Sequence, residues 1–123
     1  MSRVLLVAFL GLVVLGAGCI GCPAVAPDVS GTVVEGDRSR PLSSGESSVN
    51  RTPLEGATIE LYSAGNLLDS WATDESGFYS VGVGDACEDY PDLELVVTAP
   101  GREPAVVDLQ RLNLRVDVEL GPQ

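Results

Sequence analysis

The amino-acid sequence predicts an all-β protein, a seven-stranded antiparallel β-sandwich that follows an N-terminal signal peptide. Short segments with apolar residues at alternate positions recur along the chain, and turn-forming residues separate them. No segment after the signal has the period of an amphipathic helix. With 123 residues the chain has room for one domain, which we place at residues 28–123, after a signal peptide at residues 1–18 and a tether at residues 19–27.

The N-terminus has the pattern of an export signal. Met1-Ser2-Arg3 is a short positively charged stretch, and an uncharged, mostly apolar run follows at residues 4–18. This run has the length of a signal-peptide core and is short for a membrane-spanning helix. Residues 15–19, Leu-Gly-Ala-Gly-Cys, then resemble the lipobox of bacterial lipoproteins. The resemblance implies cleavage before Cys19 and attachment of acyl chains, such as palmitate, to that cysteine.

Other readings of this segment stay open. Gly16 stands where the lipobox usually has leucine, so Cys22 is a second candidate for the lipid. Ordinary signal cleavage after Ala26 and a membrane span over residues 4–26 are further alternatives. All of them export the domain. The lipoprotein reading, which we favour, places it in a bacterial cell envelope, held to the membrane by its acyl chains.

The remaining cysteines form an even pair if Cys19 carries the lipid. Cys22 precedes the first expected strand, and Cys87 lies in a loop between the fourth and fifth. An exported domain meets an oxidising compartment, where such pairs form disulfides. We therefore expect a Cys22–Cys87 bridge that would clamp the tether to the domain.

The seven expected strands follow from local patterns. Three lie in residues 53–83, where Ala57, Ile59 and Leu61 share the core side and the sequence Asp-Glu-Ser-Gly at residues 74–77 favours a turn. The other four are expected at residues 29–35, 93–99, 105–109 and 114–120. The last alternates strictly between apolar and charged residues, so we expect one of its faces in the core and the other in water.

A long polar segment at residues 36–51 interrupts this pattern. It contains little that a core could bury, so we expect a mobile loop without regular structure. Loops of this length are uncommon in compact domains and are sometimes functional, although a tolerated insertion is the simpler explanation. The Asn-Arg-Thr at residues 50–52 matches a glycosylation acceptor, which is irrelevant to a bacterial lipoprotein.

Four pieces of the chain resemble one family. Residues 30–34 (Ser-Gly-Thr-Val-Val), 53–61 (Pro-Leu-Glu-Gly-Ala-Thr-Ile-Glu-Leu), 73–79 (Thr-Asp-Glu-Ser-Gly-Phe-Tyr) and 97–101 (Val-Thr-Ala-Pro-Gly) look like the carboxypeptidase regulatory-like domain. The resemblance covers nearly the whole exported chain and implies a transthyretin-like sandwich in a mostly non-catalytic family. The long loop at residues 36–51 and the acidic, cysteine-bearing loop before residue 93 depart from the family pattern.

Composition excludes several functions. The chain has no His and no Lys, so it lacks His-based catalytic triads, His metal ligands and Lys isopeptide bonds. Its formal net charge of −11 repels phosphate backbones, so we expect no nucleic-acid partner. We expect no cofactor and no enzymatic activity.

Two candidate sites remain. Asp85, Glu88, Asp89 and Asp92 offer hard oxygen ligands that suit Ca²⁺, but their irregular spacing favours a solvated loop, so we expect Ca²⁺ binding to be absent or weak. Trp71 is a possible ligand contact, because it has the strand parity of Asp69 and Thr73. It also has the parity of Leu67, and on that ground we expect its ring to line the core.

These observations favour a lipid-anchored, non-enzymatic envelope protein whose sandwich is structural or binds a protein partner. The alternative is a surface lipoprotein that binds carbohydrate or another polymer, for which Trp71 is the main support because exposed aromatic rings stack on sugars.

Overall fold

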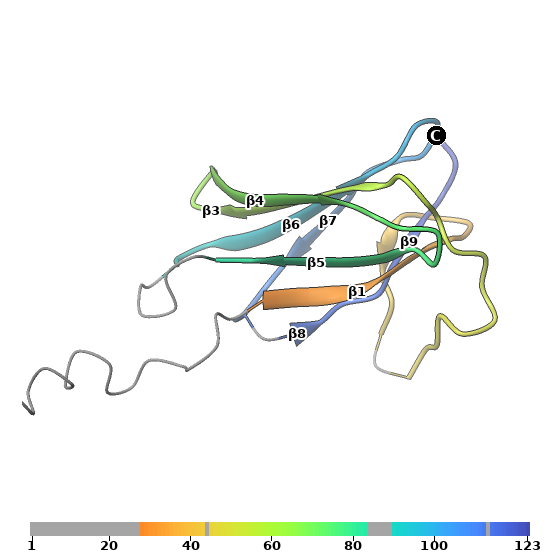
Figure 1. The fold of residues 1–123 in the computed structure, drawn as a ribbon, viewed down its shortest axis with the longest axis horizontal. Helices are drawn as coiled ribbons and strands as arrows, with labels where there is room; N and C mark the ends of the chain where they lie inside the picture. The colour runs from red at the N-terminus through yellow and green to blue at the C-terminus, as the bar shows by residue number, and fades with distance from the viewer. Residues whose placement is uncertain (1–27, 44, 84–89, 113) are drawn as a thin grey trace, which may run out of the picture.

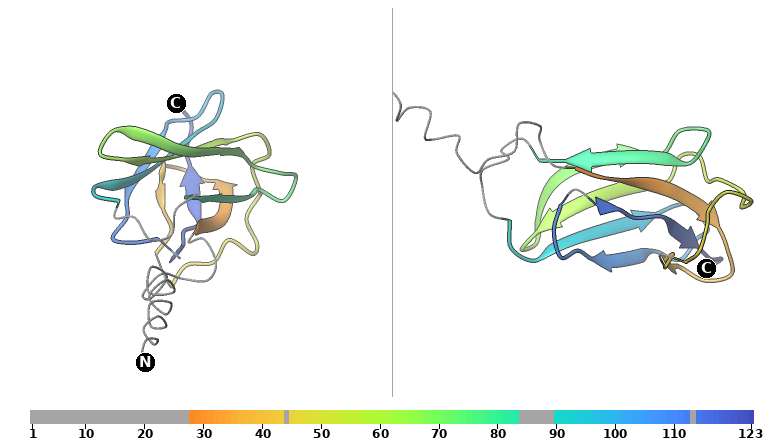
Figure 2. Two further views of the ribbon diagram at one scale, coloured as in Figure 1. Left: turned by 60° about the vertical axis from the view of Figure 1, so that its left-hand side comes forward. Right: turned by 90° about the horizontal axis from the view of Figure 1, so that it is seen from below.

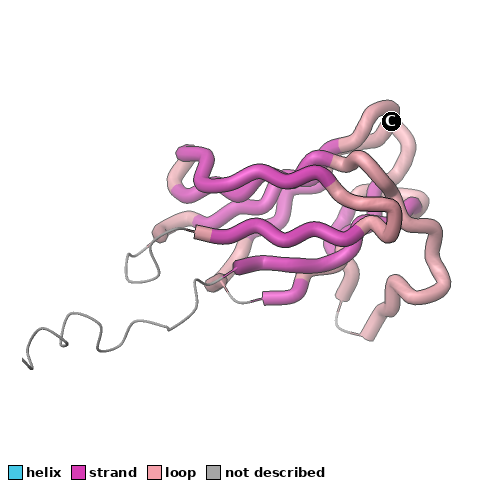
Figure 3. The backbone as a smooth tube through the Cα atoms, viewed as in Figure 1, coloured by secondary structure: helices cyan, strands magenta, loops and turns pink. Residues whose placement is uncertain are grey.

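The computed structural model describes residues 28–43, 45–83, 90–112 and 114–123, and no helix occurs among them (Figures 1 and 3). The expected signal peptide and tether lie outside these residues. The described chain contains nine strands: β1 Asp28–Glu35, β2 Arg40–Pro41, β3 Thr58–Ser63, β4 Asn66–Ala72, β5 Phe78–Gly82, β6 Leu93–Thr98, β7 Ala105–Asp108, β8 Leu114–Arg115 and β9 Val118–Leu120.

The strands form two sheets that lie one over the other (Figure 2). Sheet one has five strands in the order β2-β9-β1-β5, with β8 also paired to β1. Sheet two has four strands in the order β4-β3-β6-β7. The prediction of an all-β fold is confirmed, and the two sheets are consistent with a β-sandwich.

The core lies between the sheets and takes residues from both. The alternation expected along β3 and β6 is confirmed, because Ile59, Leu61, Leu95 and Val97 are buried while their strand neighbours are half-buried or exposed. From sheet one, Val29, Val33, Tyr79, Val81, Val118 and Leu120 complete the core. Burial of such side chains is the main stabilising contribution, about 1.5–3 kcal/mol for each large one.

The turn at residues 74–77 also forms as expected. The Asp74 carboxylate accepts hydrogen bonds from the Ser76 and Phe78 N–H groups, at 2.9 and 3.0 Å. Gly77 has a φ of +76°, a conformation that favours glycine, and its N–H bonds to the Asp74 carbonyl. This turn carries the chain from β4 of sheet two to β5 of sheet one.

The expectation that all pairing would be antiparallel is wrong. Both β8 and β9 run parallel to β1, because the chain enters sheet one from β7 of sheet two rather than through a hairpin. The single strand expected at residues 114–120 is divided into β8 and β9. At the break, the buried Tyr79 hydroxyl donates to the Val116 carbonyl at 2.6 Å. Gly31 permits this arrangement, since a Cβ there would lie 1.9 Å from the Val116 oxygen.

The interpretation of residues 36–51 as a structureless loop is also wrong. Arg40 begins the short strand β2, which pairs with β9. Its Nε lies 2.9 Å from a carboxylate oxygen of Glu119, and its terminal nitrogens make a two-point contact with Glu46 at 2.7 and 2.6 Å. Hydrogen bonds from Arg40 hold the pKa of Glu46 well below its usual range. Arg51 adds a second cation 3.6 Å from Glu119.

This cluster explains why β9 breaks the strict alternation. Val118, Glu119 and Leu120 are all buried, so the face expected in water is covered. Glu119 is only 4% exposed because Arg40 and Arg51 lie against its carboxylate, which also accepts the Asp37 N–H at 2.9 Å. A buried carboxylate needs such cations and donors nearby.

Candidate functional site

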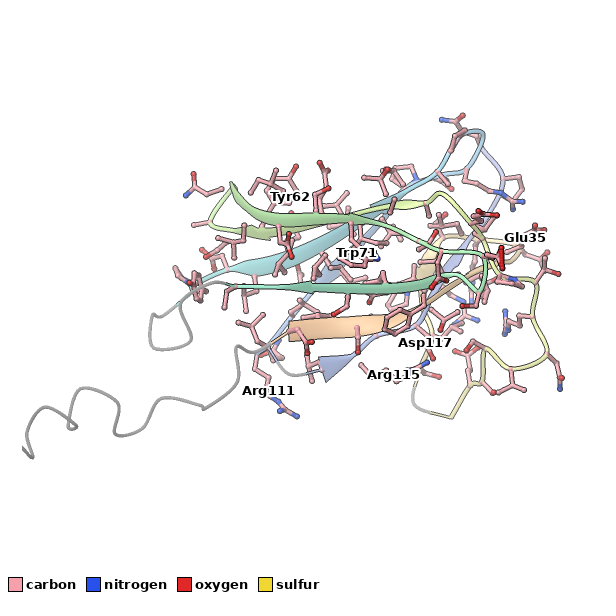
Figure 4. All side chains as sticks on the ribbon, viewed as in Figure 1. Glu35, Tyr62, Trp71, Arg111, Arg115 and Asp117 are labelled. Atoms are coloured by element: carbon pink, nitrogen blue, oxygen red, sulfur yellow. The ribbon has the colours of Figure 1, made fainter. Side chains whose placement is uncertain are left out.

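Trp71 lies on β4, at the side of the sandwich where the edge strands β4 and β5 meet. Trp71 lies directly opposite Ile59 of β3, and opposite residues of an antiparallel pair share a face, so Trp71 has the core-facing parity. Its side chain is nevertheless 46% exposed, whereas Ile59 is 0% exposed. The prediction that the ring lines the core is therefore wrong. The physical reason is that β4 is the last strand of sheet two, so the ring lies at the margin of the core (Figure 4).

A β-bulge in β4 explains why Trp71 and Leu67 do not share a face, although their spacing in the sequence predicts that they do. Leu61 pairs with Asp69, and the next residue of β3, Tyr62, pairs with Leu67, so Leu68 is the extra residue. The bulge moves Leu67 to the face of sheet two that points away from sheet one, where it is 52% exposed. Leu67 and Trp71 are four positions apart, yet their side chains lie on opposite faces.

Asp69 and Thr73 fix the backbone on either side of Trp71. The half-buried Asp69 carboxylate accepts the Gly82 N–H of β5 at 2.9 Å, which ties the two edge strands together. The buried Thr73 hydroxyl donates to the Leu54 carbonyl at 2.6 Å and accepts the Ala57 N–H at 2.9 Å. The backbone that carries the indole is therefore fixed on both sides of Trp71. This is typical of a contact residue whose backbone position is set before binding.

Of the four acidic residues proposed for Ca²⁺, the structure describes only Asp92. Asp92 is exposed, has a φ of +49° and accepts the Ala64 N–H through its carbonyl. It lines a hollow of about 520 Å³ at the ends of β6 and β7, together with Glu94 and Asp108. Within residues 28–43, 45–83, 90–112 and 114–123, no group of three or more His, Cys, Asp and Glu is arranged to hold a metal. Weak or absent Ca²⁺ binding stays a prediction.

The other candidates fall outside the described residues. These are the lipidation residue Cys19, the disulfide pair Cys22 and Cys87, and the acidic residues Asp85, Glu88 and Asp89. Within the part of the chain that the structure describes, no helix is long and apolar enough to cross a membrane.

Sequence reasoning missed a second surface, the outer face of sheet two. Leu67 and Val106 are 52% and 56% exposed there, on the two edge strands, and the half-buried Tyr62 lies beside Leu67. The alternation along β3 points to this face, since it directs Glu60 and Tyr62 away from the core. The exposure of Leu67 depends on the bulge, which no local pattern reveals.

Comparison with known proteins identifies no family for this chain. No family model matches the chain, and no curated protein matches it. Among solved structures, the chain resembles part of a 9R-lipoxygenase from Cyanothece PCC8801, with 20% identity and a TM-score of 0.39. The likeness covers 71% of this chain and 13% of the lipoxygenase chain. A similarity this low carries no conclusion about fold family or activity.

Proposed function

We propose that the protein is a lipid-anchored component of a bacterial cell envelope and that its β-sandwich is a non-enzymatic module that binds a protein partner. The lipobox-like residues 15–19 support the anchor at Cys19. The resemblance to the carboxypeptidase regulatory-like domain supports a transthyretin-like module at residues 28–123. The absence of His and Lys from the whole sequence speaks against the commonest acid–base and nucleophilic sites.

The exposure of Trp71 is the observation that carries the binding role. Tryptophan is the residue type most enriched where protein interfaces take their binding energy, and burying a ring of this size on a partner is strongly favourable. Trp71 is 46% exposed, although its strand parity directs it toward the core. The bonds of Asp69 and Thr73 hold the backbone on either side of it, so little ordering of the strand is needed on binding.

Capture from envelope extracts tests this function. The full-length, lipidated protein and its Trp71→Ala variant are immobilised, and the captured proteins are quantified by mass spectrometry. We expect at least one envelope protein on the wild type that is lost with Trp71→Ala. Phe78→Ala is the matched control, because Phe78 is a comparably exposed aromatic, at 39%, on β5 of the other sheet. Identical captured sets from the wild type and Trp71→Ala would contradict the proposal.

Binding of a carbohydrate or another polymer is the second candidate, because an exposed indole also stacks on sugar rings. A glycan array with the same proteins separates the two functions. Specific glycan binding that is lost with Trp71→Ala and kept with Trp71→Phe would favour the carbohydrate function over the protein partner.

A further inference from the structure

The outer face of sheet two is an unpartnered surface with its own pattern. The strand register places Leu67, Tyr62, Glu94 and Asp108 in one row across the four strands. The next row contains Ser70, Glu60, Val96 and Val106. Side chains directly opposite on neighbouring strands lie about 5 Å apart, so each row is a line of contacting groups.

Several apolar side chains on this face are exposed or only half-buried. Leu67 and Val106 are 52% and 56% exposed, and Tyr62 and Val96 are half-buried beside them. Figure 4 shows Tyr62 on the side of β3 that points away from sheet one. The apolar residues run diagonally across the face, from Leu67 and Tyr62 in one row to Val96 and Val106 in the next, and a partner can cover such a surface.

The charges of this face have one sign. The acids on this face are Glu60, Glu94 and Asp108, since Asp69 of β4 points inward, and the four strands of sheet two contain no basic residue. Glu94 and Asp108 lie directly opposite each other, and like charges in that position destabilise a sheet. The Tyr62 hydroxyl donates to Glu60 at 3.1 Å, and this contact raises the pKa of Tyr62.

None of the ion pairs that arginines form within the described residues involves a carboxylate of this face. Among the described residues, Arg40 and Arg51 lie against Glu46 and Glu119, Arg102 lies against Glu35, and Arg115 lies against Asp117. All of these acidic partners belong to sheet one or to loops. The described ion pairs thus leave the carboxylates of sheet two uncompensated, and a cationic partner would complement them.

The edge strand β4 is poorly suited to pairing with a further strand from a partner. Asp69 is an inward-directed acid on the edge strand, and Leu68 is a bulge residue. Both features oppose pairing of a further strand with β4. A second copy of the chain is also a poor occupant, because it would place carboxylates against carboxylates.

We propose that the outer face of sheet two docks a basic segment of a partner protein, in which Lys or Arg side chains are interspersed with apolar ones. The apolar residues of the segment would cover Leu67, Tyr62 and Val106, and its cations would meet Glu60, Glu94 and Asp108. The proposal rests on the protein-binding function above and adds to it a second surface, on the opposite face of sheet two from Trp71, with its partner chemistry.

Selection from a displayed library of random peptides tests the proposal. The full-length chain is immobilised at an ionic strength of about 0.15 M, where long-range attraction is screened. We expect enriched peptides that are rich in Lys and Arg and also contain apolar residues. Enrichment of neutral or acidic peptides would overturn the proposal, and so would equally tight binding of a plain oligolysine peptide.

Face variants locate the surface. The double variant Glu94→Gln, Asp108→Asn should bind the enriched peptides about tenfold more weakly, the effect of two exposed ion pairs together. Its melting temperature should be unchanged or higher, because a like-charge contact is removed. The control Glu75→Gln changes an exposed acid in the turn at residues 74–77 and should bind as the wild type does. Val106→Thr, at an exposed position, tests the apolar part and should also weaken binding.

The outcomes separate this proposal from the proposed function. If the double variant and Val106→Thr bind normally while Trp71→Ala does not, the docking surface is wrong and the protein-binding function stands. If no peptide is enriched and no envelope protein is captured, both are wrong.

Discussion

Thr73 provides the sharpest test of how the exposed edge at Trp71 is held. The Thr73 side chain is 4% exposed, and its hydroxyl serves two backbone groups, as donor to the Leu54 carbonyl and acceptor from the Ala57 N–H. Thr73→Val keeps the shape of the side chain and removes the hydroxyl. Both backbone groups then lose their side-chain partner in a largely dry environment.

The expected cost follows from these two contacts. A buried polar group left unsatisfied costs about 1–3 kcal/mol, and the half-buried Leu54 places its carbonyl at the low end of that range. We therefore expect Thr73→Val to lower the free energy of unfolding by about 2–3 kcal/mol. For a domain of this size, that corresponds to a fall in melting temperature of about 10–20 °C.

Urea and thermal denaturation, followed by circular dichroism, measure the effect. Thr73→Ser is the matched control, because it keeps the hydroxyl and loses only a methyl group, and it should cost no more than about 1 kcal/mol. A Thr73→Val protein as stable as the wild type, or a Thr73→Ser protein destabilised as much as Thr73→Val, would refute the reasoning.

Three further predictions concern the anchor, the cysteines and the turn. Mass spectrometry of the membrane-extracted protein should find acyl chains on a peptide that starts at Cys19, and an intact Met1 N-terminus would contradict this. Non-reducing peptide mapping should find a Cys22–Cys87 cross-link, and full alkylation of both thiols without reductant would exclude it. The Ser76 hydroxyl and then the Phe78 N–H lower the pKa of Asp74, so its carboxylate adds stability above the unfolded pKa of about 4 that is lost as the pH falls through the lower folded value. Asp74→Asn should be less stable than the wild type near pH 6, by a difference that shrinks in acid, and a pH-independent difference would refute this assignment.

Sequence reasoning succeeds in this chain where the determining contacts are local. The three strands of residues 53–83 follow from the alternation of Ile59 and Leu61 with polar residues, and from a turn in which the Asp74 carboxylate accepts the N–H groups of Ser76 and Phe78. The same holds for the buried face of β6.

The failures have non-local causes. Glu119 was expected in water because its own strand alternates, but its environment is set by Arg40 and Arg51 from a distant segment. The parallel pairing of β8 and β9 with β1 depends on the path of the chain between sheets, which local periodicity does not encode. The exposure of Trp71 and Leu67 depends on a bulge and on the edge position of β4. Candidate binding residues on edge strands are therefore the least predictable from sequence.

Site-specific photo-cross-linking in living cells tests the central claim, that the sandwich binds a protein through sheet two, most directly. A photoreactive amino acid replaces Leu67 or Val106 on the outer face of sheet two, or Phe78 on sheet one as the control. We predict that the Leu67 and Val106 positions cross-link to the same envelope protein, that this protein presents a basic surface, and that the Phe78 position does not capture it. Cross-links from Phe78 alone, or none from Leu67 and Val106, would contradict the account.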